Sequence, residues 1–209
     1  QWIIVGVLVG SLWAFAEVAL GSFLRTMALP MRSTVLTAIG AALLFAAWAR
    51  SGRPWVAGLA LLTTVAAKIV FAPSFGFGIT VINSSAAVLL EGACLVAVLY
   101  LLQAVSERQA PLLGLAAGLA ILAAGTSFYA IGIHLAPCAY LKSFTPLSFF
   151  FHETLPWAAA SALTAPLGYA LGCRWAERAA QRPVTAGLPV PALGAITGCW
   201  LACAVTVLL

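Results

Sequence analysis

The chain has 209 residues, of which 64% are hydrophobic and only 7% are charged, and its formal net charge is +5. A soluble domain carries roughly a quarter charged residues, so this composition excludes an ordinary soluble protein. The apolar runs are continuous and do not alternate with period two, which indicates membrane-spanning helices instead of a β-barrel. We therefore expect a single all-α integral membrane domain over residues 1–209.

Apolar segments separated by Pro, Gly and Arg follow one another along the chain, each close to the ~20 residues that a bilayer core of ~30 Å requires. They cover residues 2–24, 33–50, 54–72, 83–105, 110–136, 147–175 and 189–209. The sixth segment contains Pro156 and Pro166, which predict an interfacial start followed by a kinked span. The sequence thus predicts a bundle of six to seven transmembrane helices.

The orientation follows from the Lys and Arg residues of the short connections, because cytoplasmic loops carry the excess. With a cytoplasmic N-terminus, the inner connections hold Arg50, Arg53, Arg108, Arg174, Arg178 and Arg182, and the outer ones hold Arg25, Arg32 and Lys142. This bias predicts a cytoplasmic N-terminus. We also expect a multi-pass location in the cytoplasmic (inner) membrane of a prokaryote.

Three ionisable residues interrupt the apolar segments at a similar depth in the outer half: Glu17 in the first, Lys68 in the third and Glu91 in the fourth. A charge in the hydrocarbon costs at least ~2.5 kcal/mol, so such residues face the bundle interior and pair, or line a wet cavity. We expect an ion pair between Glu17 and Lys68. The network either fixes helix packing or forms the floor of an outward-facing binding cavity, and the two interpretations are compatible.

The outer connections carry residues that suit a small ligand. Glycines let the backbone approach a ligand, aromatic rings give flat apolar walls, and Asn or His side chains orient it. The predicted substrate-binding residues are Phe75, Gly76, Gly78, Asn83, Tyr140 and His152. There are two alternatives: the glycine-rich stretch forms a re-entrant turn with a purely structural role, and the aromatic residues form a belt at the membrane interface.

His134, Cys138 and His152 are the candidate metal ligands, since imidazole and thiolate suit transition metals. Pro137 interrupts any helix between the first two, and the five cysteines form no CxxC pair. We therefore expect hydrogen-bonded histidines, no metal and no cofactor. Two alternatives remain: an axial ligand to a metal-centred macrocycle, and a membrane metalloenzyme that uses His134, His152 and Glu153.

Gly6, Gly10 and Ala14 recur every four residues on one face of the first segment. Such small-residue ridges let two helices approach closely. Similar pairs occur at Gly114/Gly118, Gly168/Gly172 and Gly194/Gly198, where intramolecular packing is the simplest explanation. For the first segment we expect docking on a partner helix.

Three stretches of the first half also carry a resemblance: "GSLWAFAEVALGSFL", "LPMRSTVLTAIGAALL" and "KIVFAPSFGFGITVINSSAAVLLEGACLVAVLYLL". They resemble the substrate-binding S components of energy-coupling factor (ECF) transporters, and the second half is similar only in hydropathy and in a basic inner loop. The resemblance implies a vitamin-sized site in the outer loops and docking of the first helix on a membrane coupling subunit that works with ATPases. That family normally has six helices, one fewer than the segments counted here.

We therefore expect a membrane-embedded binding subunit for uptake of a small vitamin-like or tetrapyrrole-like nutrient. The chain has no Asp, no P-loop and no nucleophile–base pair, so we expect it not to be an enzyme, and nothing suggests nucleic acid as a partner. The alternative is an accessory structural subunit of a larger redox or light-harvesting membrane complex.

Overall fold

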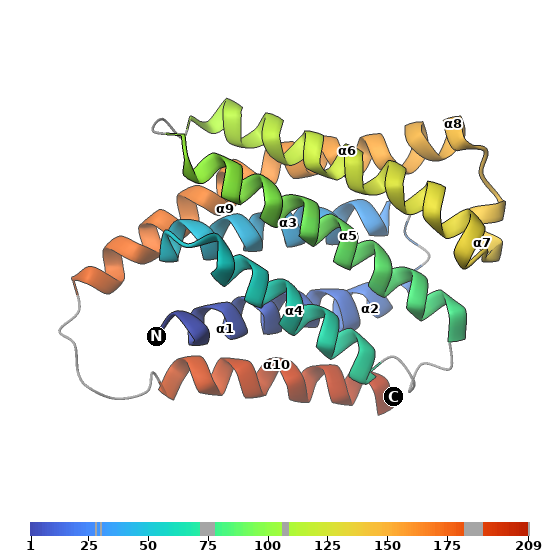
Figure 1. Ribbon diagram of the computed structural model, residues 1–209. Coiled ribbons are helices and arrows are strands. Elements are labelled where there is room, and N and C mark those ends of the chain that lie inside the picture. Colours follow the sequence, from blue (N-terminus) through green and yellow to red (C-terminus); the bar gives the residue numbers. More distant parts are fainter. Residues whose placement is uncertain (28, 30, 72–77, 106–108, 182–189, 209) are drawn as a thin grey trace.

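The computed structural model is a bundle of helices that run roughly along one direction (Figure 1). It describes residues 1–27, 29, 31–71, 78–105, 109–181 and 190–208, leaving aside the side chains of 78–82, 190, 207 and 208. Within this described part every regular element is a helix, which confirms the predicted all-α class.

The long helices follow the predicted segments closely. In chain order they are α1 (Trp2–Phe15), continued by the π-helical turn η1 (Ala16–Leu20) and α2 (Gly21–Thr26), then α3 (Arg32–Ser51), α4 (Pro54–Phe71), α5 (Gly78–Gln103), α6 (Ala110–Leu135), α9 (Leu155–Ala180) and α10 (Val190–Leu208). Three short elements connect α6 to α9: α7 (Ala139–Lys142), α8 (Pro146–Phe149) and the π-helical turn η3 (Phe150–Thr154).

Five of the described helical stretches are long and apolar enough to cross a membrane. They are Trp2–Thr26, Arg32–Ser51, Pro54–Phe71, Asn83–Gln103 and Ala110–Leu135, and Pro191–Thr206 is a shorter apolar helix. Helix α9 has 26 residues, as many as α6, but a lower mean hydropathy. The chain is therefore an all-α, multi-pass membrane protein.

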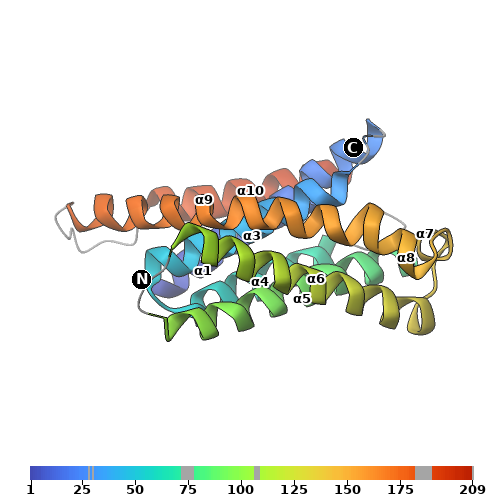
Figure 2. The same cartoon turned by 90° about the horizontal axis from the view of Figure 1, so that it is seen from above.

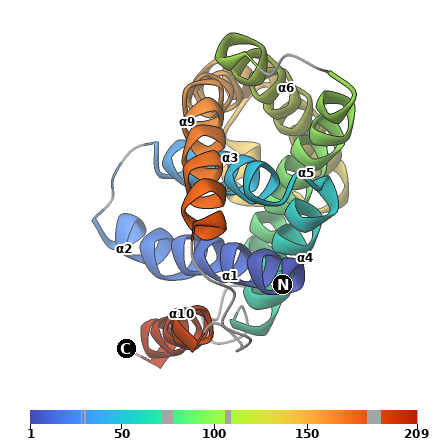
Figure 3. The same cartoon turned by 90° about the vertical axis from the view of Figure 1, so that its left-hand side faces the viewer.

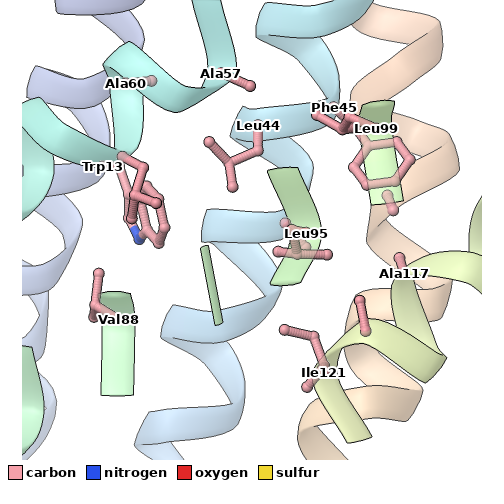
Figure 4. Packing of buried hydrophobic residues seen from close by; sticks show 14 of the residues in the cluster. Trp13, Leu44, Phe45, Ala57, Ala60, Val88, Leu95, Leu99, Ala117 and Ile121 are labelled. Carbon is pink, nitrogen blue, oxygen red and sulfur yellow. The ribbon is translucent and has the colours of Figure 1, made fainter. Parts of the chain in front are cut away.

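Helix α3 occupies the centre of the bundle. An end-on view shows α1, α4, α5 and α9 around it, all of which contact it, while α10 lies outside against α1 (Figure 3). The buried core side chains come from several of these helices, and Figure 4 shows Trp13, Leu44 and Leu95 among them. A side chain on α3 can therefore meet groups from most of the bundle.

The two ends of the bundle differ in character. Trp2, Pro54 and Ala180 lie at what we call the N-terminal end, whereas α7 and α8 gather at the opposite end, which we call the α7 end (Figure 2). The predicted sixth segment, 147–175, starts where the structure places it and ends too early, because α8, η3 and α9 follow one another without a break from Pro146 to Ala180. Pro156 stands at the start of α9, directly after η3, and Pro166 lies inside the helix.

Small residues set the closeness of several helix pairs. Gly168 and Gly172 of α9 lie against the backbone of Ala42 and Ala46 in α3, and a Cβ built on Gly114 of α6 would come 2.6 Å from the Ala162 carbonyl oxygen. Side chains of any size would push these helices apart. Two of the predicted ridges thus serve packing within the chain.

Candidate functional site

A buried ion pair joins η1, in the first long helix, to α4. The Nζ of Lys68 donates to Oε2 of Glu17 across 2.7 Å, and the two side chains are 8% and 7% exposed. The structure thus brings together the two residues that the sequence predicts to pair. Glu17 lies on η1, and a π-helical turn inserts one extra residue into a helix and is frequent at functional sites.

Further donors and acceptors complete this pair. Lys68 Nζ also donates to the Ser84 hydroxyl oxygen of α5 across 2.7 Å, and the Trp13 indole N–H donates to Oε1 of Glu17 across 3.3 Å. A lysine ammonium has three protons to donate. Lys68 donates two of these protons at 2.7 Å, which lowers the free-energy cost of burying its ammonium group in the bundle.

Glu91 of α5 brings a second acid to the same place. Its side chain is 7% exposed, hydrogen-bonds with Thr37 of α3, and interacts electrostatically with both Glu17 and Lys68. We call Glu17, Lys68, Glu91, Thr37 and Ser84 the polar cluster. Together with η1, the helices α3, α4 and α5 each contribute to it.

The charges of the polar cluster do not balance. It contains two carboxyl groups and one ammonium, and Lys68–Glu17 is the one ion pair found among the described residues. A second ionised carboxylate without a cation is costly in a low-dielectric interior. The cluster can therefore accept a proton, a cation or a hydrogen-bond donor from a ligand at Glu91.

The predicted substrate-binding residues are only partly placed. Phe75 and Gly76 lie outside the described residues, and Gly78 is the first residue of α5. The amide of Asn83 is buried and donates to the Ala136 carbonyl oxygen across 2.9 Å, so it links α5 to the end of α6. It neighbours Ser84 in the chain, and therefore lies close to the polar cluster.

Tyr140 and His152 belong to a different region, at the α7 end. The side chain of Tyr140 is 39% exposed, and its ring meets that of Phe144 edge-on at 5.3 Å. His152 is exposed, with Nδ1 2.8 Å from the Ser148 carbonyl oxygen. Among the described residues, neither side chain contacts Glu17, Lys68 or Glu91, so the structure does not bring the predicted set together in one place.

A second acid, Glu153, lies on η3 at the α7 end. Its Oε2 accepts a hydrogen bond from Ser33 across 3.0 Å, and the Trp157 indole N–H donates to the Ser33 hydroxyl across 3.1 Å. Tyr140 also hydrogen-bonds Glu153. Burial raises the pKa of Tyr140 above its ordinary value, and the charge and hydrogen bond of Glu153 raise that pKa further. We call Glu153, Ser33, Trp157 and Tyr140 the Glu153 site.

Sequence reasoning missed the neutral partners of both acids. One signal was available: Trp13 precedes Glu17 by four residues and Trp157 follows Glu153 by four, the spacing that places two side chains on one helix face. Thr37, Ser84 and Ser33 carry no such signal, because their helices meet the acids only in three dimensions.

The candidate metal ligands do not assemble. His134 and His152 are exposed and Cys138 is buried. Within the described part of the chain, no three His, Cys, Asp or Glu side chains lie close enough to hold a metal ion. The arrangement therefore gives no support to the metalloenzyme alternative.

The ridge on the first helix already has a partner. A Cβ built on Gly6 would lie 2.9 Å from Leu59, one on Gly10 would lie 2.5 Å from the Ala60 carbonyl oxygen, and Ala14 is 2% exposed. In this conformation α4 of the same chain lies against Gly6 and Gly10, and docking of Gly6, Gly10 and Ala14 on another protein stays a prediction. The pair Gly194/Gly198 on α10 differs, since a Cβ there would meet nothing within 4 Å.

One pocket lies near the α7 end, with a volume of about 150 Å³. Its walls come from α6, α8 and η3 and are Thr126, Tyr129, Ala130, Pro146, Phe149, Phe150 and Thr154. Ligand sites for vitamin-sized molecules measure ~300 to 1,000 Å³. This pocket is too small for such a ligand as it stands.

The helices and the buried charges define a class: a multi-pass helical membrane protein with an ionisable cluster inside its bundle. Comparisons with protein-family models, with curated proteins and with solved structures give no match.

Proposed function

We propose that this protein is a membrane-embedded binding subunit for uptake of a small, vitamin-sized nutrient, working with an ATP-driven coupling module. The observation that carries the proposal is the polar cluster, in which Glu17, Lys68 and Glu91 meet inside an otherwise apolar bundle. Ionisable residues are rare within membrane spans and mark ligand or ion pathways when they face a bundle interior.

The position of the cluster supports binding from the α7 end. Lys68 is one turn from the end of α4, and Ser84 lies near the start of α5, so the cluster flanks the connection that carries Phe75 and Gly76. Asn83 joins α5 to the end of α6. A ligand that enters between these segments reaches the cluster first among the buried polar groups of α4 and α5.

The charge imbalance narrows the ligand chemistry. Glu91 hydrogen-bonds a neutral hydroxyl, Thr37, while the one nearby ammonium is held by Glu17. A ligand with an N–H group or a positive charge would supply the missing donor. We therefore propose a nutrient that carries such a group, and the resemblance to ECF S components favours a vitamin.

The experiment is native mass spectrometry of the detergent-extracted protein, with the Glu91→Gln variant beside it. Wild type should retain a small molecule, and Glu91→Gln should lower its occupancy at least tenfold, because a charge-assisted hydrogen bond is worth about 1.5–3 kcal/mol. Glu177→Gln is the matched control, since it removes the same charge from an exposed position on α9. The occupancy of the small molecule in Glu177→Gln should equal that in wild type.

The alternative is a structural subunit, which the close glycine contacts and the small pocket favour. In that case the wild-type spectrum shows no bound small molecule, and the protein is stable only with a fixed set of partner chains. Equal ligand occupancy in wild type and Glu91→Gln would place the site elsewhere in the bundle.

A further inference from the structure

At the N-terminal end of the bundle, two tryptophans hold an arginine. The guanidinium carbon of Arg50, in the last turn of α3, lies 5.3 Å from the ring centroid of Trp2 and 5.5 Å from that of Trp175. Both distances are within the range of a cation–π interaction. Arg50 is thereby fixed at a point where α1, α3 and α9 come together.

A tight turn adds a second arginine to this place. Gly52 has φ +66°, in the left-handed region that favours glycine, and its N–H donates to the Trp48 carbonyl oxygen across 2.7 Å. The Ser51 hydroxyl accepts the backbone N–H of Arg53 across 3.2 Å. The turn places the guanidinium carbon of Arg53 6.0 Å from the same Trp2 ring.

The two guanidinium groups have no anionic partner among the described residues. Arg50 Nε is buried without a hydrogen bond, and neither arginine forms an ion pair in the described part of the chain. Two like charges beside one indole repel each other, and on α9 at this end of the bundle Arg174 and Arg178 outnumber the one acid, Glu177. Local electrostatics therefore favour an anion here.

We propose that Arg50 and Arg53 bind the phosphate of an anionic phospholipid headgroup in the leaflet at the N-terminal end. Arginine binds phosphate through paired N–H groups, and stacking on indole rings keeps its plane fixed. Tryptophan side chains concentrate at headgroup level, and basic groups at the ends of membrane spans attract anionic lipids. In the expected orientation this is the cytoplasmic leaflet. The inference does not depend on the proposed nutrient.

The test compares the protein in phosphatidylcholine nanodiscs with and without phosphatidylglycerol, and counts retained phosphatidylglycerol by native mass spectrometry after delipidation. The Arg50→Gln/Arg53→Gln variant should retain at least tenfold less than wild type. Arg178→Gln is the matched control, because it removes one exposed positive charge from the same end of the bundle. It should change retention about twofold or less, since diffuse attraction alone is lost.

Arg50→Lys separates a built site from diffuse attraction. Lysine keeps the charge but lacks the planar guanidinium group with its paired N–H donors. Retention of phosphatidylglycerol should therefore fall severalfold if Arg50 binds the phosphate through these donors. If Arg50→Gln does not fold, Arg53→Gln carries the test, because its side chain is exposed. The proposal fails if Arg50→Lys retains as much as wild type, or if the double variant retains as much as Arg178→Gln. It also fails if inorganic phosphate stabilises the protein in phosphatidylcholine nanodiscs as much as phosphatidylglycerol does, which would indicate a soluble anion.

Discussion

The π-helical turns η1 and η3 each carry an acid with a tryptophan four residues away, yet the two acids have different kinds of partner. Glu17 on η1 lies in the bundle interior and takes a cation, Lys68, as its partner at 2.7 Å. Glu153 on η3 lies at the α7 end and hydrogen-bonds neutral groups, Ser33 and Tyr140. The interior carboxylate has a cation in direct contact, as burial of a charge requires, whereas Glu153 accepts hydrogen bonds from hydroxyl donors, with Arg32 acting electrostatically on Tyr140 beside it.

The two sites also connect different parts of the molecule. The polar cluster joins η1, α3, α4 and α5 inside the bundle, whereas the Glu153 site joins the start of α3 to α7 and η3. We therefore expect changes in the polar cluster to act on the stability of the whole bundle. Changes in the Glu153 site should act on the α7 end.

The largest effect should come from Lys68→Met. This change leaves Glu17 and Glu91 close together without a cation, and breaking a buried pair from one side costs about 3–5 kcal/mol. The free energy of unfolding, measured by SDS titration of the protein in detergent micelles, should fall by that order. Glu17→Gln/Lys68→Met should recover most of the loss, because the carboxylate that lost its cation is then gone and the cluster returns to the wild-type excess of one acid, Glu91. A double variant no more stable than Lys68→Met would contradict the assignment of the ion pair.

The sequence was sufficient to predict the all-α class and the order of the long helices, because hydropathy is read along the chain. It was also sufficient to predict the pairing of Glu17 with Lys68, because a buried charge requires a partner and the two residues lie at a similar depth. It was insufficient for the partners that only folding selects. Gly6 and Gly10 form a ridge in the sequence, but only the packing shows that Leu59 and Ala60 of α4 fill it. Glu91 likewise meets Thr37 through a contact between helices distant in sequence.

A second prediction tests whether the Trp13 indole supports Glu17. A Cβ on Gly40 of α3 would lie 2.6 Å from the Trp13 ring, so Gly40→Ala must displace the indole and weaken its hydrogen bond to Glu17. Overpacking of this kind costs about 1–3 kcal/mol in the free energy of unfolding. Gly58→Ala is the control, since the nearest atom to its Cβ would be Val96 at 3.9 Å. Equal stability of the two variants in the same SDS titration would show that Trp13 moves freely.

A smaller effect is expected from Glu153→Gln. The amide keeps the shape and one acceptor oxygen but removes the charge, so the bonds from Ser33 and Tyr140 weaken by about 1 kcal/mol in total. The loss should appear as faster hydrogen exchange of the backbone amides of α7 and η3, with little change in α4. Faster exchange in α4 to the same degree would mean that the two acid sites are energetically coupled.

The smallest effect concerns the titration of Tyr140. Burial raises the pKa of its phenol, and the charge and hydrogen bond of Glu153 raise that pKa further. The folded chain therefore holds this proton more tightly than the unfolded chain, whose tyrosines titrate near pH ~10. The resulting contribution to stability is complete below about pH 10 and is lost as the pH rises above it. Glu153→Gln removes the charge and weakens the hydrogen bond, so the phenolate absorbance of Tyr140, obtained by difference from Tyr140→Phe, should appear at lower pH than in wild type. It should still appear above the ordinary value, because burial persists. An unchanged midpoint would show that burial alone sets the titration, and that the Glu153 carboxylate, unlike that of Glu17, exerts no measurable electrostatic effect on its neighbour.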